Sequence, residues 1–146
     1  MARKKIVAAN WKMNLTLSEG ENLIGQLLQG LPADPGCEIV IAPPFTHLQM
    51  LVNMVHGTPL RSSAQHCHSE TSGAYTGEVS VGMLKSLDIK YCITGHSERR
   101  QLFFETNQIV KAKVDAILQG GLIPIFCCGE PLEVRQAGQQ NEYVKE

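Results

Sequence analysis

The sequence predicts an α/β fold built from repeated strand–helix units. Three observations carry this prediction: five short apolar runs, helical patterns between them, and a regular spacing. The runs are KIVAAN from Lys5, CEIVIAPP from Cys37, PLRSSAQ from Pro59, KYCITG from Lys90 and GLIPIFCCGE from Gly121. Their starts are about 29 residues apart, which is typical of repeating βα architectures.

Each run is expected to form one strand. The second, fourth and fifth runs are nearly continuous in apolar residues, so we expect strands covered on both faces. The third run contains Arg61 and two serines. It is assigned as a strand only because of its neighbours.

Helical spacing fills the segments between the runs. A first helix is expected at residues 18–31, because Ser18 and Glu21 can form a capping box before an i, i+3, i+4, i+7 pattern. Another is expected between Thr106 as N-cap and Gly120 as C-terminal stop. Residues 136–146, QAGQQNEYVKE, are expected to form a sixth-unit helix. The apolar positions of the helices are Ile24, Leu27, Leu28 and Leu31; Leu48, Leu51, Val52 and Val55; Val81, Leu84 and Leu87; and Val110, Val114, Ile117 and Leu118.

Alternating strands and helices imply right-handed parallel crossovers within one domain, residues 1–146, since no composition break marks a linker. Eight such units would need about 230 residues, close to the size of a (β/α)8 barrel. Five parallel strands alone would leave two unpaired edges. Two architectures therefore stay open: an open doubly wound sheet, or an incomplete barrel of about five units.

Composition narrows the class of protein. Hydrophobic residues make up 43% and charged residues 18% of the 146 residues, as in soluble globular proteins. With a net charge of −1, the chain has no broad positive electrostatic potential that would attract nucleic acid or an anionic membrane. No signal peptide or bilayer-spanning stretch is found. Five cysteines without a CxxC pair indicate a reduced, cytoplasmic protein.

The sequence "HCH" at residues 66–68 raises the alternative of a metal site. A structural zinc ion needs four ligands, and only a local cluster is visible here. We therefore expect no metal.

Polar residues follow four of the runs, where the carboxyl ends of parallel strands bind ligands. They are Asn10-Trp11-Lys12, Ala64-Gln65, Gly95-His96-Ser97-Glu98 and Gly129-Glu130. Lys12 suits a phosphate or a developing oxyanion, and Glu98 could orient it. His96 stands at a helix start, which disfavours imidazolium and favours a neutral hydrogen-bond donor. Arg99 and Arg100 are expected to pair with carboxylates such as Glu78 or Glu105.

Four separated motifs resemble the triosephosphate isomerase family, in order and at that family's spacing. They are VAANWKMN (7–14), GAYTGEVS (73–80), TGHSERR (94–100) and CCGE (127–130). The resemblance implies a TIM (β/α)8 barrel that interconverts dihydroxyacetone phosphate and glyceraldehyde 3-phosphate through an enediolate, without cofactor, in glycolysis and gluconeogenesis. The family is itself a standard example of a histidine held neutral by a helix N-terminus. Two residues differ from the family's usual pattern: His66 stands where asparagine is common, and Thr94 stands where an aliphatic residue is usual.

The same resemblance implies residue roles. Asn10 and Lys12 would bind substrate, with Lys12 also catalytic, and His96 would be the catalytic electrophile. Ser97 would hold the catalytic base in the open state and Glu98 would partner Lys12. Thr76, Glu78 and Arg99 would lie at a homodimer interface, with Thr76 near Asn10 of the partner subunit.

The family's catalytic glutamate and glycine-rich phosphate loops are expected beyond Glu146, so the activity of residues 1–146 alone is doubtful. Two alternatives stay open: an inactive half-barrel fragment or interaction module, and another phosphate-handling barrel enzyme.

Overall fold

The computed structural model describes residues 3–145 and contains a five-stranded parallel sheet. The strands are β1 (Ile6–Asn10), β2 (Glu38–Ala42), β3 (Leu60–Ala64), β4 (Tyr91–Thr94) and β5 (Ile123–Phe126). The helices are α1 (Leu17–Gly30), η1 (Phe45–His47), α2 (Leu48–Val55), α3 (Val81–Ser86), α4 (Ser97–Leu102), α5 (Asn107–Gln119), α6 (Leu132–Gln136) and α7 (Gln140–Lys145). Every strand run of the sequence is therefore confirmed.

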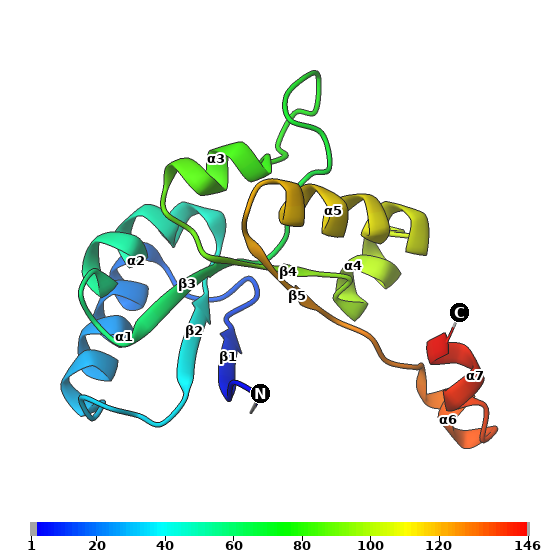
Figure 1. Cartoon of the computed structure of the whole chain (residues 1–146), viewed down its shortest axis with the longest axis horizontal. Helices are drawn as coiled ribbons and strands as arrows, with labels where there is room; N and C mark the ends of the chain where they lie inside the picture. The colour runs from blue at the N-terminus through cyan, green and yellow to red at the C-terminus, as the bar shows by residue number, and fades with distance from the viewer. Residues whose placement is uncertain (1–2, 146) are drawn as a thin grey trace.

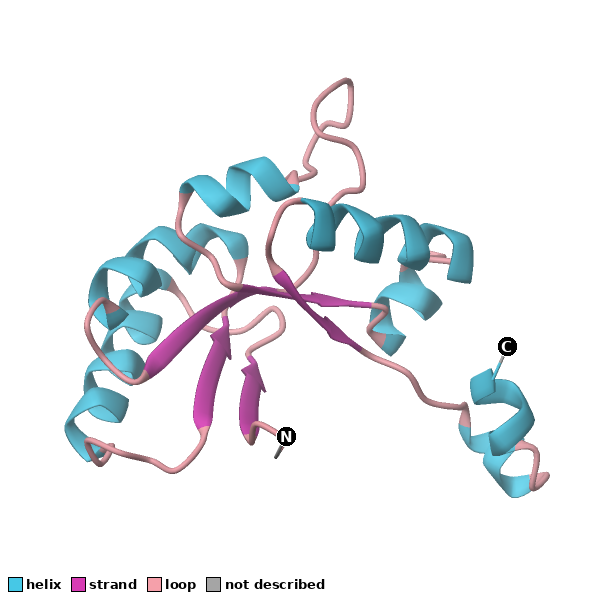
Figure 2. Ribbon diagram, in the orientation of Figure 1, coloured by secondary structure: helices cyan, strands magenta, loops and turns pink. Residues whose placement is uncertain are grey.

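The strand order decides between the two predicted architectures. The strands lie in sequence order, β1-β2-β3-β4-β5, and every neighbouring pair is parallel. A doubly wound sheet reverses its strand order and carries helices on both faces. Here the sheet curls, and α1, α2, α3 and α5 follow its outer side while the inner side stays open (Figures 1 and 2). The molecule is thus five units of a (β/α)8 barrel.

The core lies between the curled sheet and its outer helices. One cluster joins α1 and α2 to β2 and β3 through residues such as Ile24, Leu51 and Leu60. A second joins α3 and α5 to β4 through Leu84, Ile117 and Cys92. Both clusters use helix positions that the apolar spacing predicted.

The burial predicted for the strands is only partly confirmed. β2 and β4 are almost wholly buried, as continuous apolar runs indicate. The prediction is wrong for β5, where Ile123 is 44% and Phe126 53% exposed. In β1, Val7 is 58% exposed. These strands form the two ends of the sheet, so each has one neighbouring strand among the described residues.

Two helix ends differ from the predictions. The capping box uses Thr16 and Glu19 rather than Ser18 and Glu21: the Glu19 carboxylate accepts the Thr16 backbone N–H at 2.7 Å. At the far end, Gly138 takes a φ of 72°, which ends α6 and separates it from α7. The single helix predicted over 136–146 is therefore wrong for the described residues, and Glu146 lies outside them. Both short helices project from the end of β5 (Figure 1).

Both predicted ends of α5 are confirmed. The Thr106 hydroxyl caps α5 by accepting the Ile109 N–H at 3.3 Å, and Gly120 is its C-cap.

Within residues 3–145, no helix combines the length and apolar character that crossing a membrane requires.

Candidate active site

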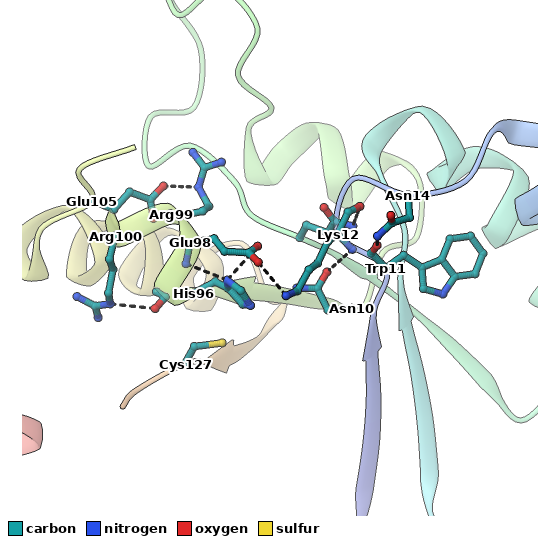
Figure 3. A network of polar contacts seen from close by, with 12 residues as sticks. Asn10, Trp11, Lys12, Asn14, His96, Glu98, Arg99, Arg100, Glu105 and Cys127 are labelled. Carbon is teal, nitrogen blue, oxygen red and sulfur yellow. Dashed lines mark hydrogen bonds and ion pairs between the residues drawn. The ribbon is translucent and has the colours of Figure 1, made fainter. Parts of the chain in front are cut away.

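The candidate site gathers at the carboxyl edge of the sheet, where the chain leaves β1 and β4. Asn10 ends β1 and Lys12 follows it, while His96 and Glu98 follow β4. Figure 3 shows these side chains pointing toward one another across the edge. The structure thus brings together residues 84 positions apart in the chain, as the rule for parallel sheets predicts.

The backbone at Lys12 is held in an unusual conformation. Its φ is 55°, in the left-handed region that residues with a Cβ seldom adopt. The Lys12 N–H donates to Asn10 Oδ1 at 2.9 Å. Gln65 Nε2 donates to the Lys12 carbonyl at 2.8 Å and to the Ala42 carbonyl at 2.9 Å. These contacts fix the segment after β1 against β2 and β3.

Gln65 is the supporting residue whose role the sequence did not reveal. Its position at the end of β3 marked it as polar where a buried run stops. Its target is the carbonyl of Lys12, 53 residues earlier, which only the folded chain brings within reach.

The predicted partnership of Lys12 and Glu98 is present. Lys12 Nζ lies 2.8 Å from Glu98 Oε1. The hydrogen bond from Lys12 holds the pKa of Glu98 below its ordinary value. Both side chains are about half exposed, so the pair contributes little to stability. Its consequence is to aim the ammonium group along the edge of the sheet.

His96 is the N-cap of α4, as its place in the sequence predicted. Its Nδ1 accepts the backbone N–H of Glu98 at 3.2 Å. Glu98 Oε2 also lies 3.5 Å from Nδ1. When the imidazole is neutral, the contact with the Glu98 N–H places its proton on Nε2, because a nitrogen that accepts a hydrogen bond carries no proton. His96 is arranged as a hydrogen-bond donor through that atom.

The two arginines of GHSERR have separate partners. Arg99 Nε lies 2.5 Å from Glu105 Oε1, as predicted. The prediction is wrong for Arg100, whose Nε donates to the Gly95 carbonyl at 2.9 Å and whose Nη1 donates to Asn107 Oδ1 at 2.7 Å. Arg100 therefore braces the turn before His96 through neutral acceptors.

A hollow of about 520 Å³ lies beside His96. Ser97, Cys127 and Glu130 are among the residues that line it.

Two of these lining side chains are poorly suited to direct chemistry. Burial and the neighbouring Cys128 raise the pKa of the Cys127 thiol, so the thiol stays protonated and is a poor nucleophile. Glu130 Oε1 accepts Arg135 Nε at 2.6 Å, which ties it to α6.

Comparison with known proteins identifies the family. A model described as triosephosphate isomerase matches residues 5–146. The chain belongs to the triosephosphate isomerase family. It is 44% identical to the triosephosphate isomerase of Amoebophilus asiaticus, over 99% of this chain and 58% of that protein. It is 49% and 48% identical to those of Bacteroides fragilis and Phocaeicola vulgatus, over 97% of this chain and 57% of each relative. The chain thus spans somewhat under three fifths of the length of these relatives.

In this family member, the segment between β3 and α3 projects from the body (Figure 1). Thr76 is exposed on it. Glu78 lies near its base, with Oε2 3.9 Å from His66 Nδ1. Burial, together with the positive charges of Arg99 and Lys113, lowers the pKa of His66 to about 4, so His66 is neutral at pH 7.

The three side chains of the HCH sequence have different surroundings. His66 packs edge-on against Phe45, with ring centroids 4.9 Å apart. Cys67 is buried in the core, and His68 stacks on Tyr75. Over residues 3–145, no group of three His, Cys, Asp or Glu side chains is placed to hold a metal ion.

Proposed function

We propose that this chain supplies the first five βα units of a triosephosphate isomerase, which interconverts dihydroxyacetone phosphate and glyceraldehyde 3-phosphate through an enediolate. One observation carries the proposal. Lys12 and His96, from different strands, meet at the carboxyl edge around the shared partner Glu98. A positioned cation beside a hydrogen-bond donor is what a reaction that builds negative charge on two oxygens needs.

The proposed roles are those that the family resemblance implies, and the contacts support several of them. Lys12 binds the substrate phosphate and offsets enediolate charge, and Asn10 holds the Lys12 backbone while contributing to substrate binding. His96 donates from Nε2 to the substrate carbonyl and moves protons between the two substrate oxygens. Glu98 aims Lys12, and Ser97, exposed at the start of α4, hydrogen-bonds the catalytic base before closure.

The base that removes the carbon-bound proton is assigned to the part of the family's length that this chain does not span. Among residues 3–145, the carboxylates of Glu98 and Glu130 lie near His96 and already have partners, Glu98 with Lys12 and Glu130 with Arg135. We place the phosphate-binding loops in the same unspanned part.

The remaining assignments concern the oligomeric state, the cellular location and the metabolic role. We propose a homodimer whose interface includes Thr76, Glu78 and Arg99, supported by the projecting segment that carries Thr76. A cytoplasmic location and a role in glycolysis and gluconeogenesis are supported by the family and by five free thiols. The proposed reaction needs no cofactor, nucleic acid or membrane.

A second candidate is an inactive half-barrel that acts as an interaction module. The exposed side chains of β1 and β5 favour it, since Val7 and Phe126 are each more than half exposed. Uncovered strands of this kind invite association.

The deciding experiment is an isomerase assay, in both directions, on the product purified from its native source after its intact mass is measured. A mass of about 27 kDa, expected for a barrel of about 250 residues, together with turnover would support the isomerase. A mass of 16.0 kDa without turnover would leave the interaction module.

A further inference from the structure

The opposite edge of the sheet carries a second polar centre, away from Lys12 and His96. A shallow hollow of about 830 Å³ lies where the strands begin. We call it the basal hollow. Its charged lining residues are Arg3, Lys4, Lys5, Arg61 and Lys90, with Asp34 and Glu38.

The basal hollow is strongly basic in a chain that is not. It holds five of the thirteen basic side chains but only two of the fourteen acidic ones, while the whole chain has a net charge of −1. Positive charge is therefore concentrated on this one surface, which attracts anions.

Glu38 holds several of these cations in place but offsets only one of their positive charges. It is buried at the start of β2 and pairs with Lys4, with Lys90 Nζ at 3.2 Å and with Arg61 Nε at 3.5 Å. Arg61 and Lys90 share Oε1, whereas the Tyr91 hydroxyl donates at 2.6 Å to Oε2, the oxygen that also pairs with Lys4. Burial would raise the pKa of Glu38, but these donors prevail and lower it to about 2. One permanent negative charge thus faces three positive ones.

The other groups leave that surplus in place. The Asp34 carboxylate accepts the Gly36 N–H at 2.9 Å, a contact within its own turn. Among residues 3–145, no carboxylate forms an ion pair with Arg3 or Lys5. Arg61 Nη1 donates to the carbonyls of Thr58 and Leu60 at 2.7 and 2.8 Å, which fixes the plane of its guanidinium group.

We propose that the basal hollow binds an anion made of two or three linked phosphate groups. Several cations spread over one surface suit a chain of phosphates better than a single charge, and an oriented guanidinium group matches phosphate oxygens. Arg61 and Lys90 are 41% and 45% exposed, so the attraction weakens as salt screens it. This site is separate from the proposed active site.

The test is calorimetric titration of the full-length protein with magnesium-free tripolyphosphate, and in a second arm with ATP. We expect binding that weakens at least about tenfold in the double variant Arg61→Gln/Lys90→Gln. Lys5→Gln, whose ammonium forms no ion pair among residues 3–145, should weaken it about threefold. The control Lys85→Gln, on α3 outside the hollow, should bind as the parent does. If ATP binds more tightly than tripolyphosphate, the natural ligand is a nucleotide. If the two bind equally, the phosphate groups alone are recognised.

Two further measurements locate the anion. Binding should persist in Lys12→Gln, and isomerase turnover should be unchanged in Lys5→Gln and in the double variant. Absence of binding, loss of binding in Lys12→Gln, or equal binding by parent, double variant and Lys5→Gln would each overturn the proposal. Circular dichroism of the double variant shows whether it is folded, and Lys5→Gln carries the test if it is not.

Discussion

At the scale of single residues, the pair Lys12–Glu98 allows a direct test of positioning. Glu98→Gln removes the charge that aims the ammonium group, 2.8 Å away. In the full-length protein we expect kcat/KM to fall about tenfold, with the fold unchanged, since exposed pairs contribute little stability. Glu133→Gln, an exposed carboxylate on α6, is the control and should keep parental kinetics. Equal kinetics in both variants would contradict the role of Glu98.

Phe104 carries avoidable backbone strain. Its φ is 56° and its side chain is 79% exposed, so glycine would relieve strain while removing little buried surface. We expect Phe104→Gly to raise the free energy of unfolding by about 0.5–1 kcal/mol in urea titrations. Phe103→Gly is the matched comparison: it loses the contact with Arg99, 4.6 Å from the ring centroid, and should lower stability. A loss in Phe104→Gly as large as that in Phe103→Gly would refute the strain argument.

Glu38 predicts a pH dependence of stability. Its pKa in the folded chain is about 2, below the ordinary 4.5, so its contribution is complete above pH 4.5 and is lost as pH falls toward 2. At pH 7, Glu38→Gln should lower the free energy of unfolding by about 2 kcal/mol. The difference from the parent should shrink between pH 4.5 and 2 in urea titrations. Glu21→Gln, exposed on α1, should show no such trend, and a constant difference for Glu38→Gln would exclude this origin.

The main residues of the candidate site could be predicted because each has a local signal in the sequence. His96 and Lys12 directly follow strand runs, so the strand-end rule and the motifs marked them. Gln65 and the neutral partners of Arg100 could not be predicted the same way. Their acceptors are backbone carbonyls and an amide, whose positions are set by the folded chain.

At the scale of elements, two glycines give opposite predictions for one substitution. A Cβ at Gly120 would lie 2.3 Å from Val81 Cγ1, where the end of α5 meets the start of α3. We expect Gly120→Ala to lower the free energy of unfolding by about 1–3 kcal/mol. A Cβ at Gly25, inside α1, meets nothing within 4 Å, so Gly25→Ala should raise stability by about 0.5–1 kcal/mol. Thermal or urea unfolding distinguishes the two, and similar changes would contradict the packing of α5 on α3.

Element boundaries show where periodicity stops being informative. Thr16 and Ser18 both precede carboxylates three residues later, so spacing alone could not choose the capping box that the structure uses at Glu19. Continuous apolar character predicted burial of β5, but burial depends on neighbours beyond the strand itself. The helical pattern of 136–146 contained Gly138, whose left-handed backbone ends the helix.

At the scale of the whole molecule, sheet order and one-sided helices establish five units of a barrel whose first and last strands are exposed. The sequence spacing predicted the repeat, but it could not choose between a curled and a doubly wound sheet. That choice depends on whether the helices cover one face of the sheet or both, and the two arrangements have the same alternation of strands and helices along the sequence.

The most direct test of the central claim is turnover of triose phosphate by the full-length protein carrying His96→Gln, beside the parent. If the imidazole donates from Nε2 to the substrate carbonyl, kcat should fall at least about a hundredfold. Circular dichroism should stay unchanged, since among the described residues the His96 side chain contributes a single cap hydrogen bond to α4 and its backbone contacts are kept in the variant. A folded His96→Gln variant that turns over triose phosphate at the parental rate would contradict the account.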